Sequence, residues 1–172
     1  TLLSPVGRPF VAGILEHARA ACVFTTPTTV AYDRYQPNSL APNRAAWSHD
    51  NRGAMLRISG GPGDQSTNIE NRIGDPAANP YLYMTSQILA GVDAIKRQAE
   101  PPPPTDAPYE VEAAMLPTSL KEALDALDED PFYRDQLGDG FIDYIKTLKM
   151  SEVERSAAGP EDWAQREYFE LF

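Results

Sequence analysis

The 172-residue sequence predicts an α+β fold in which antiparallel strands carry the functional residues, helices pack against them, and the C-terminal third is helical. Three observations support this fold class. Residues 54–59 alternate apolar and polar side chains, which is typical of a half-buried strand. The glycine-rich residues 60–64 precede a second strand around Glu70, so a β-hairpin that pairs Glu70 with Arg57 is expected. Apolar residues at helical spacing occur on both sides of this hairpin.

The elements of the first half follow from short sequence signals. Pro9 predicts the start of a helix whose apolar stripe extends to Cys22. Residues 25–29 are rich in threonine and predict an extended segment. Residues 35–46 contain turn-forming proline and asparagine and predict a loop. The alternation in the first strand places Ala54, Leu56 and Ile58 on the core face and Met55, Arg57 and Ser59 on the other.

The second half is predicted to be helical. Asn79 is expected to cap a helix whose first position is Pro80 and which ends near Arg97. Its buried side is predicted to hold Leu82, Ile88, Leu89, Val92 and Ile95.

Beyond a proline-rich connector at residues 101–104, further helices are expected. Ser119 begins a capping box for a helix that ends near Leu127. Two more helical pieces begin near Asp130 and Asp139. The aromatic segment 163–172 is expected to pack on the domain or on another subunit.

Charge and composition exclude some classes of function. Residues 1–100 contain 9 Lys and Arg against 8 Asp and Glu, whereas residues 101–172 contain 6 against 17. An acidic second half argues against nucleic-acid binding, which requires a basic surface. No apolar run approaches the ~18 residues of a membrane span, and no signal peptide is recognised, so a cytoplasmic protein is expected. The single cysteine, Cys22, is interpreted as a buried, unreactive thiol.

Residues 68–82 are the most informative segment. Because side chains alternate along a strand, Glu70 and Arg72 point to one face while the two isoleucines of the segment point toward the core. Pro76 has no N–H for a strand ladder and ends the strand. A carboxylate and a guanidinium side by side at a strand end can hold a divalent metal ion next to an anionic substrate.

This segment resembles the glutamine synthetase family, whose members use ATP to join the γ-carboxyl group of glutamate to ammonia or an amine. The run Gly-Asp-Pro-Ala-Ala-Asn-Pro-Tyr-Leu at residues 74–82 is long and family-specific. Residues 47–58 resemble the family's Asn-Arg-x-x-x-x-Arg-Ile strand, and residues 32–34 resemble its Tyr-x-Arg substrate element. The three elements agree in order and spacing, and the resemblance extends from about Pro9 to the C-terminus.

The resemblance implies roles for individual residues. Glu70 is expected to bind the metal ion, Mg²⁺ or Mn²⁺, that lies nearer the ATP phosphates. Arg34 and Arg72 are expected to bind glutamate, and Arg52 and Arg57 to stabilise the phosphoryl group in transfer. The alternative for each residue is an ordinary structural ion pair. The implied reaction is phosphoryl transfer from ATP to glutamate, followed by attack of the amine on γ-glutamyl phosphate.

Two departures from the family pattern concern the substrates. Members that use ammonia carry a glutamate six residues after the Tyr-x-Arg arginine, and here Leu40 occupies that position. An apolar side chain would not attract ammonium but could line a pocket for an alkyl or aryl group, so the acceptor is predicted to be an organic amine. Many members have basic residues before the metal-binding glutamate, whereas Asn68 here could hydrogen-bond a phosphate of ATP without adding charge.

The family's other metal ligands lie upstream of the region that this chain resembles. Residues 1–172 are therefore interpreted as the C-terminal portion of the catalytic domain, with the site in residues 1–100 and an acidic helical region in residues 101–172. The chain alone is expected to be inactive. Its expected partners are the missing N-terminal half and neighbouring subunits of a ring-shaped homo-oligomer.

Three functions compete at this point. The leading interpretation is part of a ligase that joins L-glutamate to an organic amine. Synthesis of glutamine from ammonia is the second, and Leu40 argues against it. The third is a non-catalytic structural or assembly fragment. The arginines at positions that match the order and spacing of the family's motifs argue against it.

Overall fold

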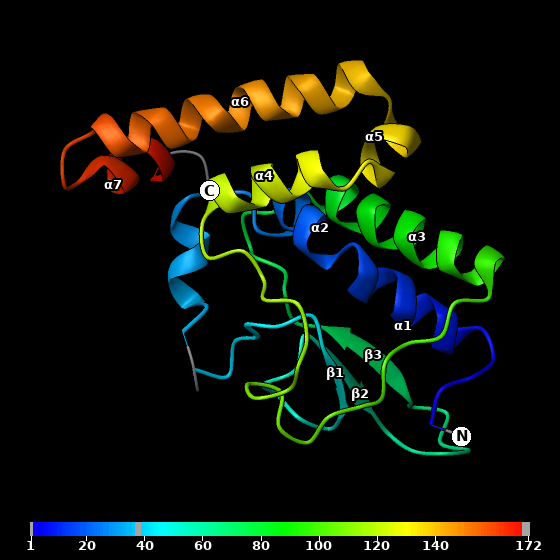
Figure 1. Cartoon of the computed structure of the whole chain (residues 1–172). Helices are drawn as coiled ribbons and strands as arrows, with labels where there is room; N and C mark the ends of the chain where they lie inside the picture. The colour runs from blue at the N-terminus through cyan, green and yellow to red at the C-terminus, as the bar shows by residue number, and fades with distance from the viewer. Residues whose placement is uncertain (1, 37–38, 170–172) are drawn as a thin grey trace.

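The computed structural model describes residues 2–36 and 39–169. The helices are α1 (Gly7–Glu16), α2 (Ala18–Thr25), the 3₁₀ helix η1 (Val30–Arg34), α3 (Pro80–Arg97), α4 (Leu120–Glu129), α5 (Phe132–Leu137), α6 (Asp139–Ala158) and α7 (Trp163–Tyr168). The strands are β1 (Trp47–His49), β2 (Leu56–Ser59) and β3 (Asn68–Asn71). Figure 1 shows the sheet at one end of the molecule, α1 to α3 in the middle, and α4 to α7 at the other end. The α+β fold class and the helical C-terminal third are confirmed.

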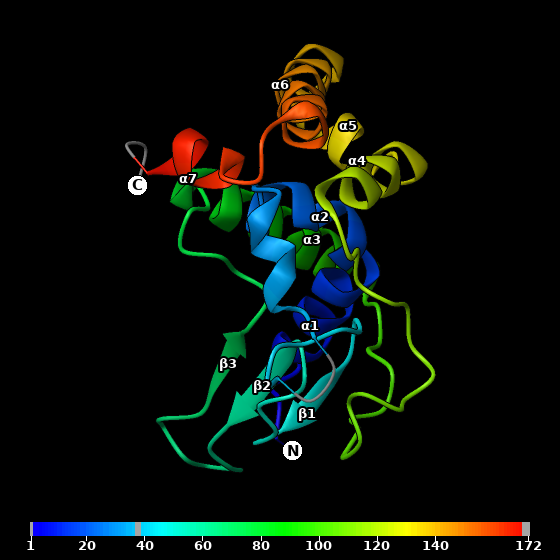
Figure 2. The same ribbon diagram turned by 90° about the vertical axis from the view of Figure 1, so that its left-hand side faces the viewer.

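The sheet has the strand order β1-β2-β3, with β3 at one edge (Figure 2). Strands β2 and β3 are antiparallel and place Arg57 opposite Glu70, which confirms the predicted hairpin. Strand β1 pairs with β2 in parallel, and the sequence pattern did not predict this third strand. Met55 was expected to face away from the core but is fully buried. Regular strand geometry begins only at Leu56, so the alternation of side chains starts there.

The N-terminal helical region differs from its prediction in two ways. It begins at Gly7 and divides into α1 and α2 at His17, instead of running unbroken from Pro9. Thr25 belongs to α2, so the extended segment predicted at residues 25–29 is wrong. Helix α2 packs on α4, and this tertiary contact outweighs the β propensity of threonine. Cys22 is fully buried in α2, and burial raises the pKa of its thiol to about 12, as expected for an unreactive cysteine.

Helix α3 begins as predicted, since the side-chain oxygen of Asn79 accepts hydrogen bonds from the N–H groups of residues 81 and 82. Its buried face is not the predicted one. Ile88 and Val92 are exposed, because the helix packs on α1 through its small residues. A Cβ atom added at Gly91 would lie 2.1 Å from the ring of Phe10. This close approach of the two helices leaves no room for the larger side chains between them.

The C-terminal helices are anchored by polar contacts. The hydroxyl of Ser119 accepts a hydrogen bond from the N–H of Glu122 and caps α4, as predicted. Helix α7 packs on the domain, because the hydroxyl of Tyr168 contacts the carboxylate of Glu152 on α6 and the Oγ1 atom of Thr29. The predicted final helix extends to Phe172, and its residues 170–172 lie outside the described residues.

None of the helices in residues 2–36 and 39–169 is long and apolar enough to cross a membrane.

Substitution of Gly13 tests the packing of α1 on α3. A Cβ atom at Gly13 would lie 2.0 Å from the main-chain oxygen of Ala90, so Gly13→Ala must force the two helices apart. We expect Gly13→Ala to lower the free energy of unfolding by about 1–3 kcal/mol, measured by urea denaturation. Gly140→Ala is the control, because a Cβ there has open space, and we expect it to raise stability by up to about 1 kcal/mol. Equal stability of the two variants would contradict the packing.

Candidate active site

The candidate site is built around the carboxylate of Glu70 on β3. The register of β2 and β3 places Arg57 directly opposite Glu70, and the Nη1 atom of Arg57 donates to Glu70 Oε2 at 3.0 Å. Arg72 lies two residues further along, on the same side, and its Nη1 atom donates to Glu70 Oε1 at 2.6 Å. Each carboxylate oxygen therefore accepts a charge-assisted hydrogen bond from a different arginine. We call Arg57, Glu70 and Arg72 the arginine–glutamate cluster.

The two arginines keep Glu70 ionised to a lower pH than an isolated glutamate would allow. Partial burial acts to raise the pKa of this carboxyl group, but the hydrogen bonds and charges of Arg57 and Arg72 outweigh it and hold the pKa below its usual value. The side chain is 39% exposed, so water screens part of the interaction. Glu70 is consequently an ionised carboxylate at neutral pH.

Arg72 also connects the cluster to two loops. Its Nε atom donates to the main-chain oxygen of Arg52 at 2.9 Å, and its Nη2 atom donates to the main-chain oxygen of Leu40 at 3.2 Å. A single planar guanidinium thus contacts β3, the turn before β2 and the loop at residues 39–42. Through Arg72, the main chains of Arg52, expected to contact the phosphoryl group, and of Leu40, expected to contact the amine, are both linked to Glu70.

Leu40 itself has an unusual backbone conformation. Its φ is +63°, in the left-handed region that leucine rarely adopts, and its side chain is exposed. The conformation is fixed on both sides, because Leu40 accepts from Arg72 and the hydroxyl of Tyr109 donates to the oxygen of Ala41 at 3.2 Å. Backbone strain that is held by surrounding contacts is characteristic of functional loops.

Arg34 lies at the continuation of β3 rather than in the arginine–glutamate cluster. Its Nη2 atom donates to the main-chain oxygens of Ile73 and Gly74, and its guanidinium lies 4.6 Å from the ring centre of Tyr35. Its Nε atom is buried and has no hydrogen-bond partner among the described residues. Arg34 therefore supports the main chain just after Arg72, and no hydrogen bond in the described part of the chain joins it to Glu70.

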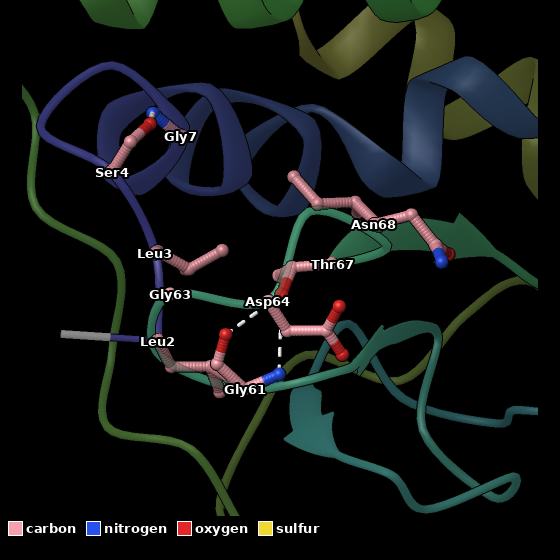
Figure 3. A pocket seen from close by; sticks show the side chains of 10 residues that line it. Leu2, Leu3, Ser4, Gly7, Gly61, Gly63, Asp64, Thr67 and Asn68 are labelled. Atoms are coloured by element: carbon pink, nitrogen blue, oxygen red, sulfur yellow. Dashed lines mark hydrogen bonds between the residues drawn. The ribbon is translucent and has the colours of Figure 1, made fainter.

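Arg52 and Asn68 are, like Leu40, exposed members of the predicted set. Within residues 2–36 and 39–169, the guanidinium of Arg52 has no hydrogen bond or ion pair, so it is free to contact an anion. Asn68 begins β3, and its amide donates to the oxygen of Ser66 at 2.9 Å. It lines a pocket of about 350 Å³ between the N-terminal residues 2–7 and the glycine-rich turn (Figure 3).

The sequence analysis missed one residue that contacts the cluster. Asp50 accepts hydrogen bonds from the Nε and Nη2 atoms of Arg57, with the Nε contact at 3.1 Å. The hydrogen bond and charge of Arg57 lower the pKa of Asp50. An acidic residue directly before the Asn-Arg pair was the available signal, but only the folded β1–β2 pair brings it to Arg57.

A metal ion would need ligands from elsewhere. In the described part of the chain, no three His, Cys, Asp or Glu side chains come together as a metal site requires. Glu70 is one carboxylate, and both of its oxygens already contact arginine. These residues do not fit a metal ion by themselves, although Glu70 has the charge and the chemistry of one ligand.

Comparison with known proteins identifies the class to which this fold and cluster belong. The family model described as "Glutamine synthetase, catalytic domain" matches residues 1–168. The chain therefore belongs to the glutamine synthetase family of ligases.

Individual relatives make the comparison more specific. The chain is 47% identical to a gamma-glutamylanilide synthase from an Acinetobacter species, over 99% of this chain and 36% of the relative. It is 41% identical to a glutamine synthetase from Vibrio alginolyticus, over 89% of this chain and 35% of the relative. Its fold superposes on a GmaS/ADP complex with a TM-score of 0.79 and 29% identity, over 98% of this chain and 40% of that chain. The chain thus spans only about two fifths or less of the length of these proteins.

Replacement of Glu70 tests the electrostatics of the cluster. Because the pKa of Glu70 is lowered in the folded protein, the stability it contributes is fully present above its unfolded pKa of about 4.5 and is lost as the pH falls through the lower folded value. We expect Glu70→Gln to reduce the free energy of unfolding at pH 7, where Arg72 loses its ion pair with Glu70 and Arg57 keeps only the one with Asp50, and to change it much less near pH 3. Urea denaturation at both pH values measures this. The same loss at both values would show that charge pairing is not the cause.

Proposed function

We propose that this protein takes part in an ATP-dependent ligase reaction that joins the γ-carboxyl group of L-glutamate to an organic amine through γ-glutamyl phosphate. The arginine–glutamate cluster is the observation that carries this proposal. It presents an ionised carboxylate between two guanidinium groups at the edge of a sheet, and Arg72 also contacts the main chain of Arg52, whose guanidinium has no hydrogen bond or ion pair within the described residues. Phosphoryl transfer depends on such preorganised charge rather than on covalent chemistry by the protein.

The residues divide into two roles in this reaction. Arg52 and Arg57 stabilise the negative charge of the phosphoryl group as it passes from ATP to glutamate. Arg72 and Arg34 bind the glutamate substrate, Arg72 through the guanidinium donors that its three contacts leave available. Asn68 is assigned to the nucleotide, because its amide has two N–H donors and one of them is left for a phosphate oxygen when the other donates to Ser66.

Mg²⁺ or Mn²⁺ would neutralise the phosphates in a ligase of this family. Glu70 is the residue that would contribute to such a site, together with ligands from outside the described residues, which hold no cluster of three such side chains. The relatives are more than twice as long as the matched region, which supports a complete site formed with further polypeptide. We propose accordingly that residues 1–172 are the C-terminal portion of a catalytic domain that functions in a ring-shaped homo-oligomer.

The choice of an organic amine rests on Leu40. Arg72 holds the main chain of Leu40 beside the cluster, and the exposed leucine side chain adds an apolar surface where a carboxylate would attract ammonium. The relative named gamma-glutamylanilide synthase supports an amine with an aryl group. A glutamine synthetase that uses ammonia is the second candidate, supported by the Vibrio alginolyticus relative.

An acceptor panel tests the proposal on the full-length protein. We expect release of ADP that requires glutamate and is faster with aniline or an alkylamine than with ammonium. Faster turnover with ammonium would favour glutamine synthesis. No turnover with any acceptor, together with no thermal stabilisation by ATP and glutamate, would favour a structural protein.

Substitution of Leu40 tests the acceptor preference directly. Leu40→Glu introduces a carboxylate that attracts ammonium, so we expect the ratio of kcat/KM for ammonium to that for the organic amine to rise about tenfold or more. A tenfold change corresponds to about 1.4 kcal/mol, well below the ~4 kcal/mol of two opposite charges 4 Å apart near a protein surface. Leu40→Met keeps an apolar side chain and should leave the ratio unchanged. An unchanged ratio in Leu40→Glu would remove Leu40 from the acceptor pocket.

A further inference from the structure

Asp50 lies at the point where β1 ends, and its main chain is fixed there. Its N–H donates to the oxygen of Ile58 at 2.9 Å, which extends the pairing between β1 and β2. Its φ is +52°, in the left-handed region that aspartate tolerates better than most residues. This turn of the backbone puts the carboxylate beside Arg57, seven residues later in the sequence.

Asp50 and Glu70 contact different parts of the guanidinium group of Arg57. Asp50 Oδ1 accepts from both Nε and Nη2, which are the two donors on one edge of the group. The remaining nitrogen, Nη1, donates to Glu70 Oε2 at 3.0 Å. Because a guanidinium is planar and rigid, holding one edge fixes the direction of the opposite end.

The hydrogen-bond partners of Asp50 and Glu70 indicate which of these two carboxylates Arg57 keeps as a partner and which it can exchange. Asp50 is bound by two donors of the same arginine, and in the described part of the chain its side chain has no other hydrogen-bond partner. Glu70 shares its charge between Arg57 and Arg72, so it can lose the single bond to Arg57 and still keep a partner. Without Asp50, that single bond to Glu70 would be the only ion pair within residues 2–36 and 39–169 that orients Arg57.

We infer that Asp50 is a positioning residue that holds Arg57 by one edge, so that the Nη1 end can exchange Glu70 for a phosphoryl oxygen without losing its orientation. The inference rests on the proposed function and extends it, since it names the residue that prepares Arg57 for phosphoryl transfer. Asp50 does not touch the substrates in this scheme. It reduces the number of orientations that Arg57 must give up when the phosphoryl group arrives.

The test uses the full-length protein with ATP, glutamate and its best amine. We expect Asp50→Ala to lower kcat by about 10- to 100-fold and to weaken inhibition by inorganic phosphate about tenfold, while the KM for glutamate stays within about twofold. Asp50→Asn should be intermediate, because its amide oxygen can still accept from Arg57 but carries no charge. Asp125→Asn is the matched control, since Asp125 forms an exposed ion pair with Lys121 on α4, and we expect it to leave all three quantities unchanged.

The outcomes separate this inference from the proposed function. Unchanged kcat and phosphate inhibition in Asp50→Ala, in an otherwise active enzyme, would overturn the positioning role alone. A fall in kcat that accompanies a lower thermal midpoint, with phosphate inhibition unchanged, would show a purely structural role and overturn it as well. If the wild-type protein shows no turnover that depends on both glutamate and ATP, the proposed function is overturned. The role of Asp50 in that function is then overturned as well.

Discussion

The shared carboxylate of Glu70 is the interaction on which the rest of the candidate site depends. Two guanidinium groups of like charge each donate to one of its oxygens, and the ionised carboxylate offsets their mutual repulsion. The strand register supplies this arrangement, since Arg57 lies opposite Glu70 in the β2–β3 pair. The same carboxylate is therefore a structural counterion of both arginines.

Arg72 links the carboxylate of Glu70 to two loops beside the sheet. Its contacts with the main chain of Arg52 and Leu40 mean that the phosphate side and the acceptor side of the proposed reaction are held by one side chain. A lysine at this position would supply a single nitrogen and could not span the three contacts. Away from the site, helices α1 and α3 pack closely on each other at Gly13 and Gly91.

Membership of the glutamine synthetase family and the geometry of the arginine–glutamate cluster both support the proposed ligase function. The chain spans only part of the length of its relatives. The arginine–glutamate cluster contains one carboxylate, and a complete metal site needs more ligands than that. Leu40 is the residue on which the proposed preference for an organic amine rests. Its backbone, with a φ of +63°, is held by hydrogen bonds from Arg72 to its own oxygen and from Tyr109 to the oxygen of Ala41.

The sequence by itself determined the α+β class, the hairpin, the caps at Asn79 and Ser119, and the grouping of Glu70 with Arg57 and Arg72. Each of these depends on local signals or on the twofold alternation of a strand. Only the tertiary structure decided which side of α3 is buried, that Thr25 is helical and that Asp50 holds Arg57. These features depend on contacts between segments, and neither side-chain periodicity nor intrinsic propensity specifies which segments meet.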